Sequence, residues 1–333
     1  MEITMLGSGA WGTALAQLLC KNGHSVTLWN RSRTRVEEME VTRKNPRLKG
    51  ISLHEDMKFD ADLSCVSTSD MVVFAVPSFA IRQTAEQVRP HLKKDAVLVS
   101  VTKGIEANTC LRMTQVIEEV IGIPAAALSG PSHAEEVSIG IPTGCVAACT
   151  DMSIAEQIQD VFMNDTFRVY ASSDVVGVEL SAALKNVIAL CAGISDGLGL
   201  GDNTKALLVT RGLTELARLG VAMGGHSETF AGLAGVGDMI VTCTSAHSRN
   251  RQAGILIGKG LGVSEAMETV GAVVEGYYAA NSAHQLAAKI GIEMPIVEEA
   301  YAVLYEGKDP ADTIGSLMRR GKKHEFEEAG WSN

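Results

Sequence analysis

The most constraining feature of the sequence is a glycine turn near its start, in which Gly7, Gly9 and Gly12 match the pattern GxGxxG. The turn follows a short apolar run, residues 3–6, and opens a helix-like stretch, residues 10–21. In such a unit the first glycine permits a tight turn, the second lets a pyrophosphate approach the backbone, and the third lets helix and strand pack closely. The turn therefore predicts a dinucleotide-binding unit.

Short apolar runs alternate with helix-like stretches through the first half of the chain. Continuous apolar runs of strand length are typical of parallel strands that helices cover on both faces. The alternation predicts an α/β fold with a doubly wound, Rossmann-type parallel sheet. The expected strands are 3–6, 26–29, 71–76, 96–101 and 125–128, extended by 144–149 and 167–170, and the expected helices are 10–21, 79–88 and 110–121.

The pattern changes near residue 172, after which almost no strand pattern remains. Asp174 is placed as the N-cap of a long helix, and further helical stretches follow. We therefore expect a dinucleotide-binding domain at 1–172 and an all-helical substrate and catalytic domain at 173–333. The expected helices are 175–191, 204–219, 264–267, 279–289, 295–306 and 311–318.

The charge and cysteine content of the chain limit the classes of ligand and the cellular compartment that we expect for it. A formal net charge of -10 disfavours nucleic acid and anionic membrane surfaces, so an anionic ligand needs a local cluster of cations. The 7 cysteines contain no CxxC motif, which is typical of buried thiols in a reducing cytosol, and no metal site is expected. Glu2 and the early glycine turn argue against a signal peptide, and no apolar stretch reaches about 18 uninterrupted residues. We expect a cytoplasmic enzyme without a membrane span.

The tip of the second expected strand bears on the choice of cofactor. NAD enzymes usually carry Asp or Glu there to accept from the ribose 2′-hydroxyl. This chain has Asn30 and Arg31 instead, followed closely by Arg33. Arg31 can hold a 2′-phosphate by charge-assisted hydrogen bonds, whereas the alternative is a solvated loop. NADP(H) is favoured, with NAD(H) as a possible cofactor.

Lys185 lies within the expected helix 175–191, which is apolar nearly all round and should be buried. Its helical neighbours at three and four residues carry no carboxylate, and Glu179 lies on another face. Such a lysine either pairs with a group elsewhere or has a lowered pKa, and both conditions suit a general acid or base. The alternative, a lysine that extends its ammonium to the surface, remains open on periodicity alone.

Other polar residues follow expected strands, where parallel sheets bind ligands. Lys103 comes directly after the strand 96–101, and Gly130 and Ser132 follow the next one. His133 lies beside them, but the sequence supplies no partner to orient it as a base.

A third group combines Asp238 with Ser248, Arg249 and Asn250. The planar guanidinium of Arg249 with two neutral donors beside it suits a phosphate dianion. Together with the two lysines it would make a local anion site, unless these residues belong to separate surface loops.

With these residues assembled, the chain resembles the bacterial NAD(P)-dependent glycerol-3-phosphate dehydrogenases over essentially its whole length. The resemblance is carried by GSGAWGTALA at the start, VTKGIE around Lys103, LSGPSHAEEV around Gly130, ELSAALKNVIALCAGISDGLGLGDNTKA around Lys185 and GLAGVGDMIVTCTSAHSRNR around Asp238 and Arg249. It implies reversible reduction of dihydroxyacetone phosphate to sn-glycerol 3-phosphate, a phospholipid precursor, by an enzyme that is commonly a homodimer.

The resemblance also implies roles for individual residues. Lys185 matches the proton donor and acceptor, with Lys103, Asp238 and Thr242 as further catalytic positions. Expected substrate contacts are Lys103, Gly130, Ser132, Lys185, Asp238, Ser248, Arg249 and Asn250. Expected cofactor contacts, glycine turn included, are Gly7, Ser8, Gly9, Trp11, Gly12, Arg31, Lys103, Ala134, Arg249, Val273 and Glu275. In this scheme Lys185 protonates the substrate oxygen, the charge of Lys103 lowers the pKa of Lys185, and Arg249 anchors the phosphate.

Two other functions fit the same architecture. One is a dehydrogenase of the 6-phosphogluconate or 3-hydroxyisobutyrate type, which acts on a hydroxy acid and has a lysine on the first helix of its helical domain. The set Ser248, Arg249 and Asn250 disfavours it, because that set suits a phosphate. The other is a non-catalytic NADP-binding regulator, which needs neither Lys103 nor Lys185.

Overall fold

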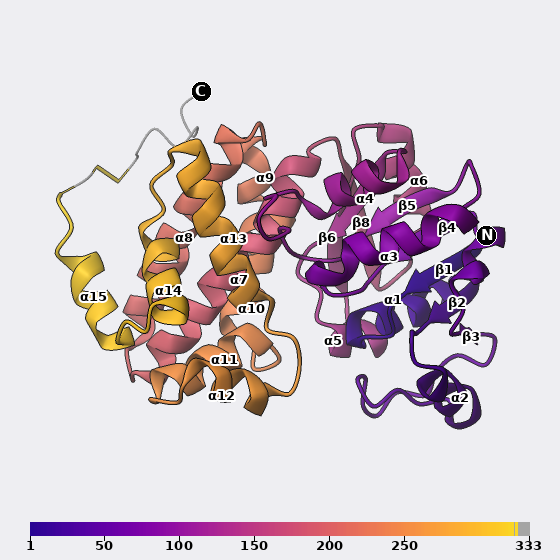
Figure 1. Ribbon diagram of the computed structural model, residues 1–333, viewed down its shortest axis with the longest axis horizontal. Coiled ribbons are helices and arrows are strands. Elements are labelled where there is room, and N and C mark those ends of the chain that lie inside the picture. Colours follow the sequence, from indigo (N-terminus) through magenta and orange to yellow (C-terminus); the bar gives the residue numbers. More distant parts are fainter. Residues whose placement is uncertain (323, 326–333) are drawn as a thin grey trace. The chain divides into compact units, whose positions relative to one another are not determined.

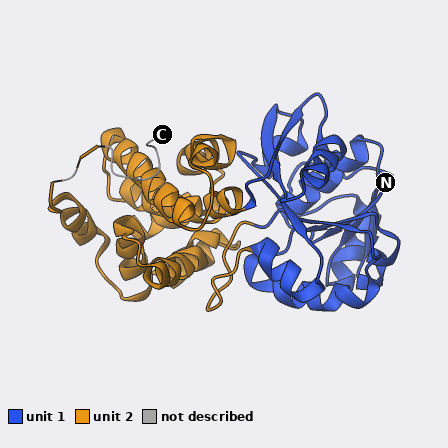
Figure 2. Cartoon of the chain, turned by 90° about the horizontal axis from the view of Figure 1, so that it is seen from above, with its two compact units in different colours: residues 1–102, 113–175 blue, residues 103–112, 176–333 orange. Residues whose placement is uncertain are grey.

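The computed structural model describes residues 1–322 and 324–325. It divides the chain into two compact units, shown in blue and orange in Figure 2. One comprises residues 1–102 and 113–175, and the other comprises residues 103–112 and the chain from 176 onward. The sequence pattern predicts a single boundary at about 172, with 103–112 in the first domain. The structure instead packs this segment with the helical unit, a placement that apolar periodicity does not reveal.

The first unit is built on one sheet of eight strands in the order β3-β2-β1-β4-β5-β6-β7-β8. Every neighbouring pair is parallel except β6 and β7, which run antiparallel. The strands are β1 Glu2–Leu6, β2 Ser25–Trp29, β3 Lys58–Asp60, β4 Met71–Phe74, β5 Val97–Ser100, β6 Ala125–Ser129, β7 Thr143–Ala148 and β8 Phe167–Ser172. The doubly wound α/β prediction is confirmed, with the antiparallel pair and β3 as features that it missed.

Helices connect these strands. α1 (Ala10–Lys21) packs beside α5 (Ala134–Ser138) and α6 (Met152–Phe162), and α3 (Ile81–Val88) packs beside α4 (Met113–Ile121) (Figure 1). α2 (Arg33–Thr42) follows β2, and short 3₁₀ turns span Leu63–Thr68, Ser78–Ala80 and Arg89–His91. β4 and β6 are buried along their whole length, as expected of central strands covered by helices.

The second unit is helical, as predicted (Figure 1). Its helices are α7 Val175–Gly197, α8 Asp202–Ala222, α9 Ser227–Ala231, the π-helical turn η4 Leu233–Gly237, α10 Asp238–Thr244, α11 Arg249–Gly258, α12 Val263–Val270, α13 Glu275–Ile290, α14 Pro295–Tyr305 and α15 Pro310–Met318.

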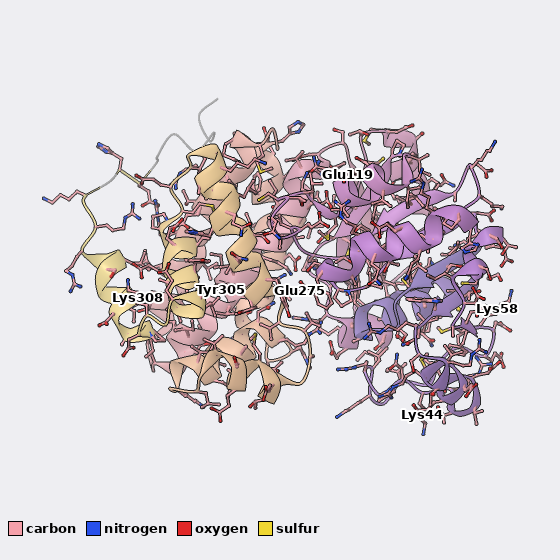
Figure 3. All side chains as sticks on the ribbon, in the orientation of Figure 1. Lys44, Lys58, Glu119, Glu275, Tyr305 and Lys308 are labelled. Atoms are coloured by element: carbon pink, nitrogen blue, oxygen red, sulfur yellow. The ribbon has the colours of Figure 1, made fainter. Side chains whose placement is uncertain are left out.

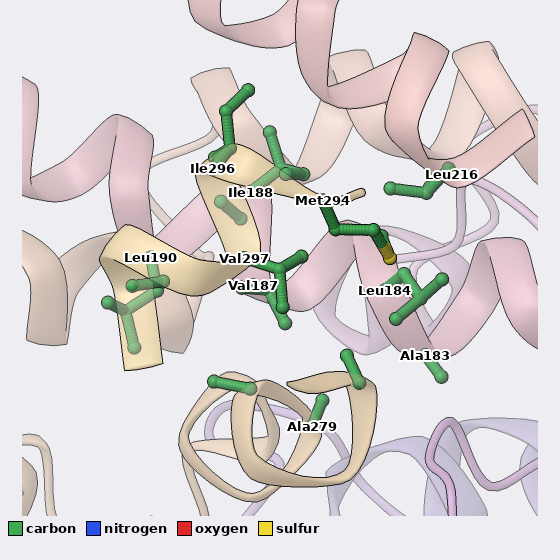
Figure 4. Packing of buried hydrophobic residues seen from close by; sticks show 14 of the residues in the cluster. Ala183, Leu184, Val187, Ile188, Leu190, Leu216, Ala279, Met294, Ile296 and Val297 are labelled. Atoms are coloured by element: carbon green, nitrogen blue, oxygen red, sulfur yellow. The ribbon is translucent and has the colours of Figure 1, made fainter. Parts of the chain in front are cut away.

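Helix α7 forms the centre of this unit. It is long and apolar enough to cross a membrane, but 89% of its most apolar window is buried inside the protein. Figure 4 shows Val187 and Ile188 of α7 packed among Met294, Val297 and Leu216. Burial on all sides explains why the helix is apolar nearly all round.

α7 and α11 approach each other until their backbones touch. A Cβ atom added at Gly193 would lie 2.1 Å from the carbonyl oxygen of Arg251, and one added at Gly254 would lie 2.1 Å from that of Leu190. Gly197 and Gly258 make the same kind of approach one turn further along. We call these four residues the glycine seam. It sets α11 against α7 without intervening side chains.

Candidate active site

In the glycine turn between β1 and α1, two of the three glycines have no space for a side chain, and the third has free space beside it. A Cβ atom at Gly7, where φ is +118°, would lie 2.8 Å from the carbonyl oxygen of Ala75, and one at Gly12 would lie 2.1 Å from the carbonyl oxygen of Gly7. A Cβ atom at Gly9 would meet nothing within 4 Å. Gly9 is exposed and caps the N-terminus of α1. The turn therefore presents bare backbone at the position where a pyrophosphate is expected to approach.

Two asparagines hold this turn. The side chain of Asn30 donates to Ser8 Oγ and accepts from the backbone N–H of Ser32 at 2.8 Å. Buried Asn45 donates to the carbonyl oxygen of Ser8 at 2.9 Å and to Thr13 Oγ1 at 2.7 Å. In the sequence, Asn30 stands out only because no carboxylate occupies its position, and Asn45 carries no signal because it lies in a loop far from the motif.

Side chains expected to contact the cofactor lie around this turn. Arg31 is exposed two residues beyond the end of β2, and Trp11 is half-buried in the first turn of α1. The indole Nε1 of Trp11 is buried without a hydrogen-bond partner in the part of the chain that the structure describes. Arg33 is the first residue of α2, whose N-cap is Ser32. Directly after β2 the chain therefore carries Asn30 and an exposed arginine rather than Asp or Glu.

The loop after β6 carries the next predicted residues. The hydroxyl of Ser132 donates to the carbonyl oxygen of Gly130 at 2.9 Å, which closes a small turn. Ala134 is buried and begins α5, a helix of five residues capped by His133. These residues belong to the sheet-containing unit, like the glycine turn.

The helical unit brings four predicted catalytic residues into direct contact. Lys185, on α7 and 4% exposed, donates from Nζ to Asp238 Oδ1 and to Thr242 Oγ1, the latter at 2.7 Å. Lys103 Nζ donates to Asp238 Oδ2 at 2.9 Å. Asp238, 1% exposed at the start of α10, therefore bridges two ammonium groups. The interpretation of Lys185 as a lysine that reaches the surface is wrong.

The charges of this cluster shift its proton affinities. Burial lowers the pKa of Lys185 to about 7, and the nearby positive charge of Lys103 also lowers it, against the attraction of Asp238. Burial opposes ionisation of Asp238, but Lys103 and Lys185 hold its pKa below the usual range. Asp238 is thus a carboxylate, and Lys185 can gain or lose a proton near neutral pH.

Ser248, Arg249 and Asn250 lie at the start of α11, in different environments. Arg249 is exposed. Ser248 is buried and caps α11, with its side chain accepting from the backbone N–H of Arg251 at 3.3 Å. The amide of buried Asn250 donates to Asn186 Oδ1 at 2.9 Å and accepts from the backbone N–H of Gly276 at 2.8 Å. Arg249 therefore has the more accessible side chain of the three.

Asn250 also ties the start of α13, beside the predicted cofactor residues Val273 and Glu275, to α7. Gly276 follows Glu275, the first residue of α13, which Figure 3 labels. Val273 and Glu275 are half-buried. Asn186, next to Lys185, was not predicted, although its position beside the lysine was the available signal. The network places the start of α11 and of α13 against the helix that carries Lys185.

A cavity of about 390 Å³ lies elsewhere in the helical unit, among α7, α8, α14 and α15. Its lining includes Glu215, which is buried and accepts from the backbone N–H groups of Ile296 and Val297. Burial raises the pKa of Glu215 to about 7. Within the described part of the chain, the lining contains none of the predicted site residues.

Comparisons with known proteins show the family of the chain. The family model for the N-terminus of NAD-dependent glycerol-3-phosphate dehydrogenase matches residues 2–155, and the model for the C-terminus matches residues 174–315. A glycerol-3-phosphate dehydrogenase [NAD(P)+] from Thermoanaerobacter sp. (strain X514) is 51% identical over 98% of this chain and 99% of its own length. One from Moorella thermoacetica is 51% identical over 99% of each.

Solved structures agree as well. The crystal structure of glycerol-3-phosphate dehydrogenase from Coxiella burnetii superposes with a TM-score of 0.93 at 37% identity, covering 96% of this chain and 99% of that one. A ketopantoate reductase from Ralstonia eutropha, at 17% identity and a TM-score of 0.64 over 94% of this chain and 100% of its own, shares the fold alone. The chain belongs to the NAD-dependent glycerol-3-phosphate dehydrogenase family, as its sequence motifs had indicated.

Proposed function

We propose that this chain reduces dihydroxyacetone phosphate reversibly to sn-glycerol 3-phosphate with NAD(P)H, and that Lys185 is its general acid and base. The observation that carries the proposal is the Lys185 ammonium, buried between Asp238 and Thr242 with its pKa lowered to about 7. An amine that changes protonation near neutral pH serves both directions of a carbonyl–alcohol interconversion.

Among the described residues, hydrogen bonds to Asp238 and Thr242 take two of the protons of the Lys185 ammonium. An ammonium has three N–H bonds, and two of them point to Asp238 and Thr242. The third donates to the carbonyl oxygen of the substrate and moves to it as negative charge develops there. In the reverse direction the neutral amine takes the hydroxyl proton. The nicotinamide, when bound, supplies or accepts the hydride.

Lys103 and Asp238 support this transfer electrostatically. Asp238 orients the Lys185 ammonium, and Lys103 prevents the carboxylate from stabilising that ammonium fully. A lysine paired with a carboxylate that no other cation contacts would have a pKa too high for it to release its proton at neutral pH. The shared carboxylate therefore tunes the acid strength of Lys185.

Arg249 is proposed as the principal phosphate anchor. Its guanidinium presents a planar fork of donors from the exposed start of α11. Ser248 and Asn250, although engaged in capping and in the link to Asn186, fix the backbone beside it. We propose Gly130 and Ser132 as further substrate contacts. Binding the remote phosphate positions the carbonyl for reaction.

The cofactor residues fit a phosphorylated dinucleotide. The open backbone at Gly9 accepts a pyrophosphate, and Arg31 supplies a cation where NAD enzymes carry a carboxylate. We propose that NADP(H) is preferred over NAD(H). Arg31→Glu should raise KM for NADPH more than KM for NADH, whereas Arg35→Glu, an exposed arginine on α2, should leave the ratio unchanged. An unchanged ratio in Arg31→Glu would overturn the preference.

The role of Lys185 is tested by Lys185→Met, which should lower kcat by about 10²- to 10⁴-fold while the protein stays folded. The matched control is Lys205→Met, because Lys205 is also a helical lysine paired with a carboxylate, Asp196 at 2.7 Å. Near-normal turnover in the Lys185 variant would remove this lysine from the mechanism.

The substrate is tested by following NADPH oxidation with dihydroxyacetone phosphate and with keto acids in parallel. Preference for a keto acid would favour a hydroxy-acid dehydrogenase, and tight NADPH binding without turnover of any ketone would favour a regulator. We further propose a cytoplasmic homodimer that supplies glycerol 3-phosphate for phospholipid synthesis. Sedimentation of the purified protein tests the dimer.

A further inference from the structure

The segment between β5 and α4 carries Lys103 and forms a small hairpin. Ile105 and Arg112 make an antiparallel bridge, and the backbone N–H of Glu106 donates to the carbonyl oxygen of Leu111 at 2.9 Å. Ile105 and Cys110 are buried in the core of the helical unit. The hairpin thus belongs to the helical unit, although both flanking elements, β5 and α4, belong to the unit that contains the sheet.

Side chains fasten this hairpin to two helices. Arg112 Nη1 donates to Glu179 Oε2 on α7. The hydroxyl of Ser282 on α13 donates to the carbonyl oxygen of Ile105 at 3.1 Å. The Arg112 and Glu179 side chains are 11% and 5% exposed, so the pair is desolvated and its position is closely defined.

The ion pair of Arg112 and Glu179 connects the two segments that carry Lys103 and Lys185. Glu179 lies on the same helix as Lys185, six residues before it, and Arg112 ends the hairpin whose first residue is Lys103. The helix that carries one ammonium is therefore tied to the segment that carries the other. Both ammonium groups meet at Asp238.

We propose that Arg112 and Glu179 are positioning residues, whose buried ion pair fixes the hairpin on α7 and thereby keeps Lys103 against Asp238. This inference rests on the proposed function, in which Lys103 tunes Lys185. Without the pair, Lys103 moves away from Asp238, the carboxylate interacts more strongly with Lys185, and the pKa of Lys185 rises. Among the described residues, the other titratable groups that interact with Lys185 are Asp238 and the thiol of Cys243, both on α10.

The primary test is Glu179→Gln, which removes the charge at nearly constant shape. The falling limb of the kcat–pH profile for reduction should move to higher pH by at least about half a unit, and KM for dihydroxyacetone phosphate should rise. Glu119→Gln is the matched control, because Glu119 pairs with Arg82 at 2.8 Å on the surface of the other unit. A profile in Glu179→Gln that coincides with that of the wild type would overturn the inference.

A second variant covers the event that Glu179→Gln does not fold. Replacing both partners, Arg112→Met with Glu179→Met, removes the two charges of the pair together, a kind of replacement that is commonly tolerated. A folded double variant should still show the shifted pH limb, because an apolar contact does not fix direction as an arginine fork does. A wild-type profile there would also overturn the inference. Arg112→Lys, which keeps the charge, should shift the pH limb less than Glu179→Gln does.

A double-mutant cycle separates positioning from general destabilisation. In a Lys103→Met background, Glu179→Gln should cause no further shift of the pH limb, because it acts through Lys103. An equal further shift would show that Glu179 acts independently and would overturn the inference.

A measurement without substrate distinguishes failure of this inference from failure of the proposed function. Competitive acetylation of lysine amines across a pH series, followed by mass spectrometry of the Lys185 peptide, reports the titration of Lys185 directly. Its midpoint should rise in Glu179→Gln, even for a protein that does not turn over dihydroxyacetone phosphate. An unchanged midpoint would overturn the positioning role, whereas a shifted midpoint without turnover would overturn only the assigned reaction.

Discussion

The hydroxyl of Thr242 donates to the main-chain oxygen of Asp238, 2.6 Å away, and this bond decides which way the hydroxyl faces. A hydroxyl has one proton, so toward Lys185, at 2.7 Å, it can only accept. Thr242 therefore receives one N–H bond of the ammonium and leaves the bond intended for substrate undisturbed.

Thr242→Val is expected to lower kcat for reduction by about tenfold, since one hydrogen bond that orients the proton donor is lost. Thr242→Ser should retain most of the activity. Thr244→Val is the control, because Thr244 makes the same kind of backbone bond, to Ile240 at 2.7 Å, but is exposed. Equal losses in the two valine variants would contradict the role given to Thr242.

The two reaction directions are expected to respond oppositely to pH. Reduction needs the ammonium form of Lys185, so kcat should fall as pH rises through about 7, the lowered pKa of this lysine. Oxidation needs the neutral amine, so kcat should rise through the same range. Steady-state rates in both directions on one enzyme preparation check this, and parallel trends would exclude Lys185 as the shared group.

Two alanine substitutions in the glycine turn should separate stability from cofactor binding. Gly12→Ala should lower Tm, because its Cβ would lie 2.1 Å from the carbonyl oxygen of Gly7. Gly9→Ala should leave Tm unchanged, because its Cβ meets nothing within 4 Å, but should weaken NADPH binding where the pyrophosphate needs the space. Thermal melts and fluorescence titrations measure both, and undiminished binding in Gly9→Ala would refute the placement of the pyrophosphate.

Glu215 should make stability fall with rising pH. Burial raises its pKa from 4.5 to about 7, so the folded protein binds this proton more tightly than the unfolded chain. The protonated Glu215 therefore adds about 3 kcal/mol to the free energy of unfolding at pH values below the pKa that Glu215 has in the unfolded chain. This stabilisation is lost as pH rises to the pKa that Glu215 has in the folded protein. Glu215→Gln should flatten the dependence of Tm on pH across this range, whereas Glu265→Gln, exposed on α12, should not.

The sequence sufficed for the fold because its signals are local. Continuous apolar runs identified the central strands, and the glycine turn identified the first strand–helix connection. β3 and the antiparallel placement of β7 were not predictable in this way. β3 has three residues, none of them fully buried, and strand direction depends on tertiary pairing rather than on composition.

The catalytic cluster was predictable only in part. Lys185 was recognisable as a cation in an apolar helix. Its partner Asp238, however, is separated from it by 53 positions in the sequence and from Lys103 by 135 positions. The ion pair of Arg112 and Glu179 spans 67 residues and carries no motif. Long-range pairs of this kind depend on how helices dock, which periodicity does not encode.

The glycine seam between α7 and α11 has a consequence for how this protein can diverge. Lys185 and Arg249 stand on two helices whose separation is set by main-chain contact at Gly193 and Gly254. Any side chain introduced there would force the helices apart and lengthen the interval from proton donor to anchoring cation. Under the proposed function, the distance between Lys185 and Arg249 has to match the distance between the carbonyl oxygen and the phosphate of a three-carbon substrate. Adapting this enzyme to longer sugar phosphates therefore requires redesign of a helix crossing rather than a change of one pocket residue.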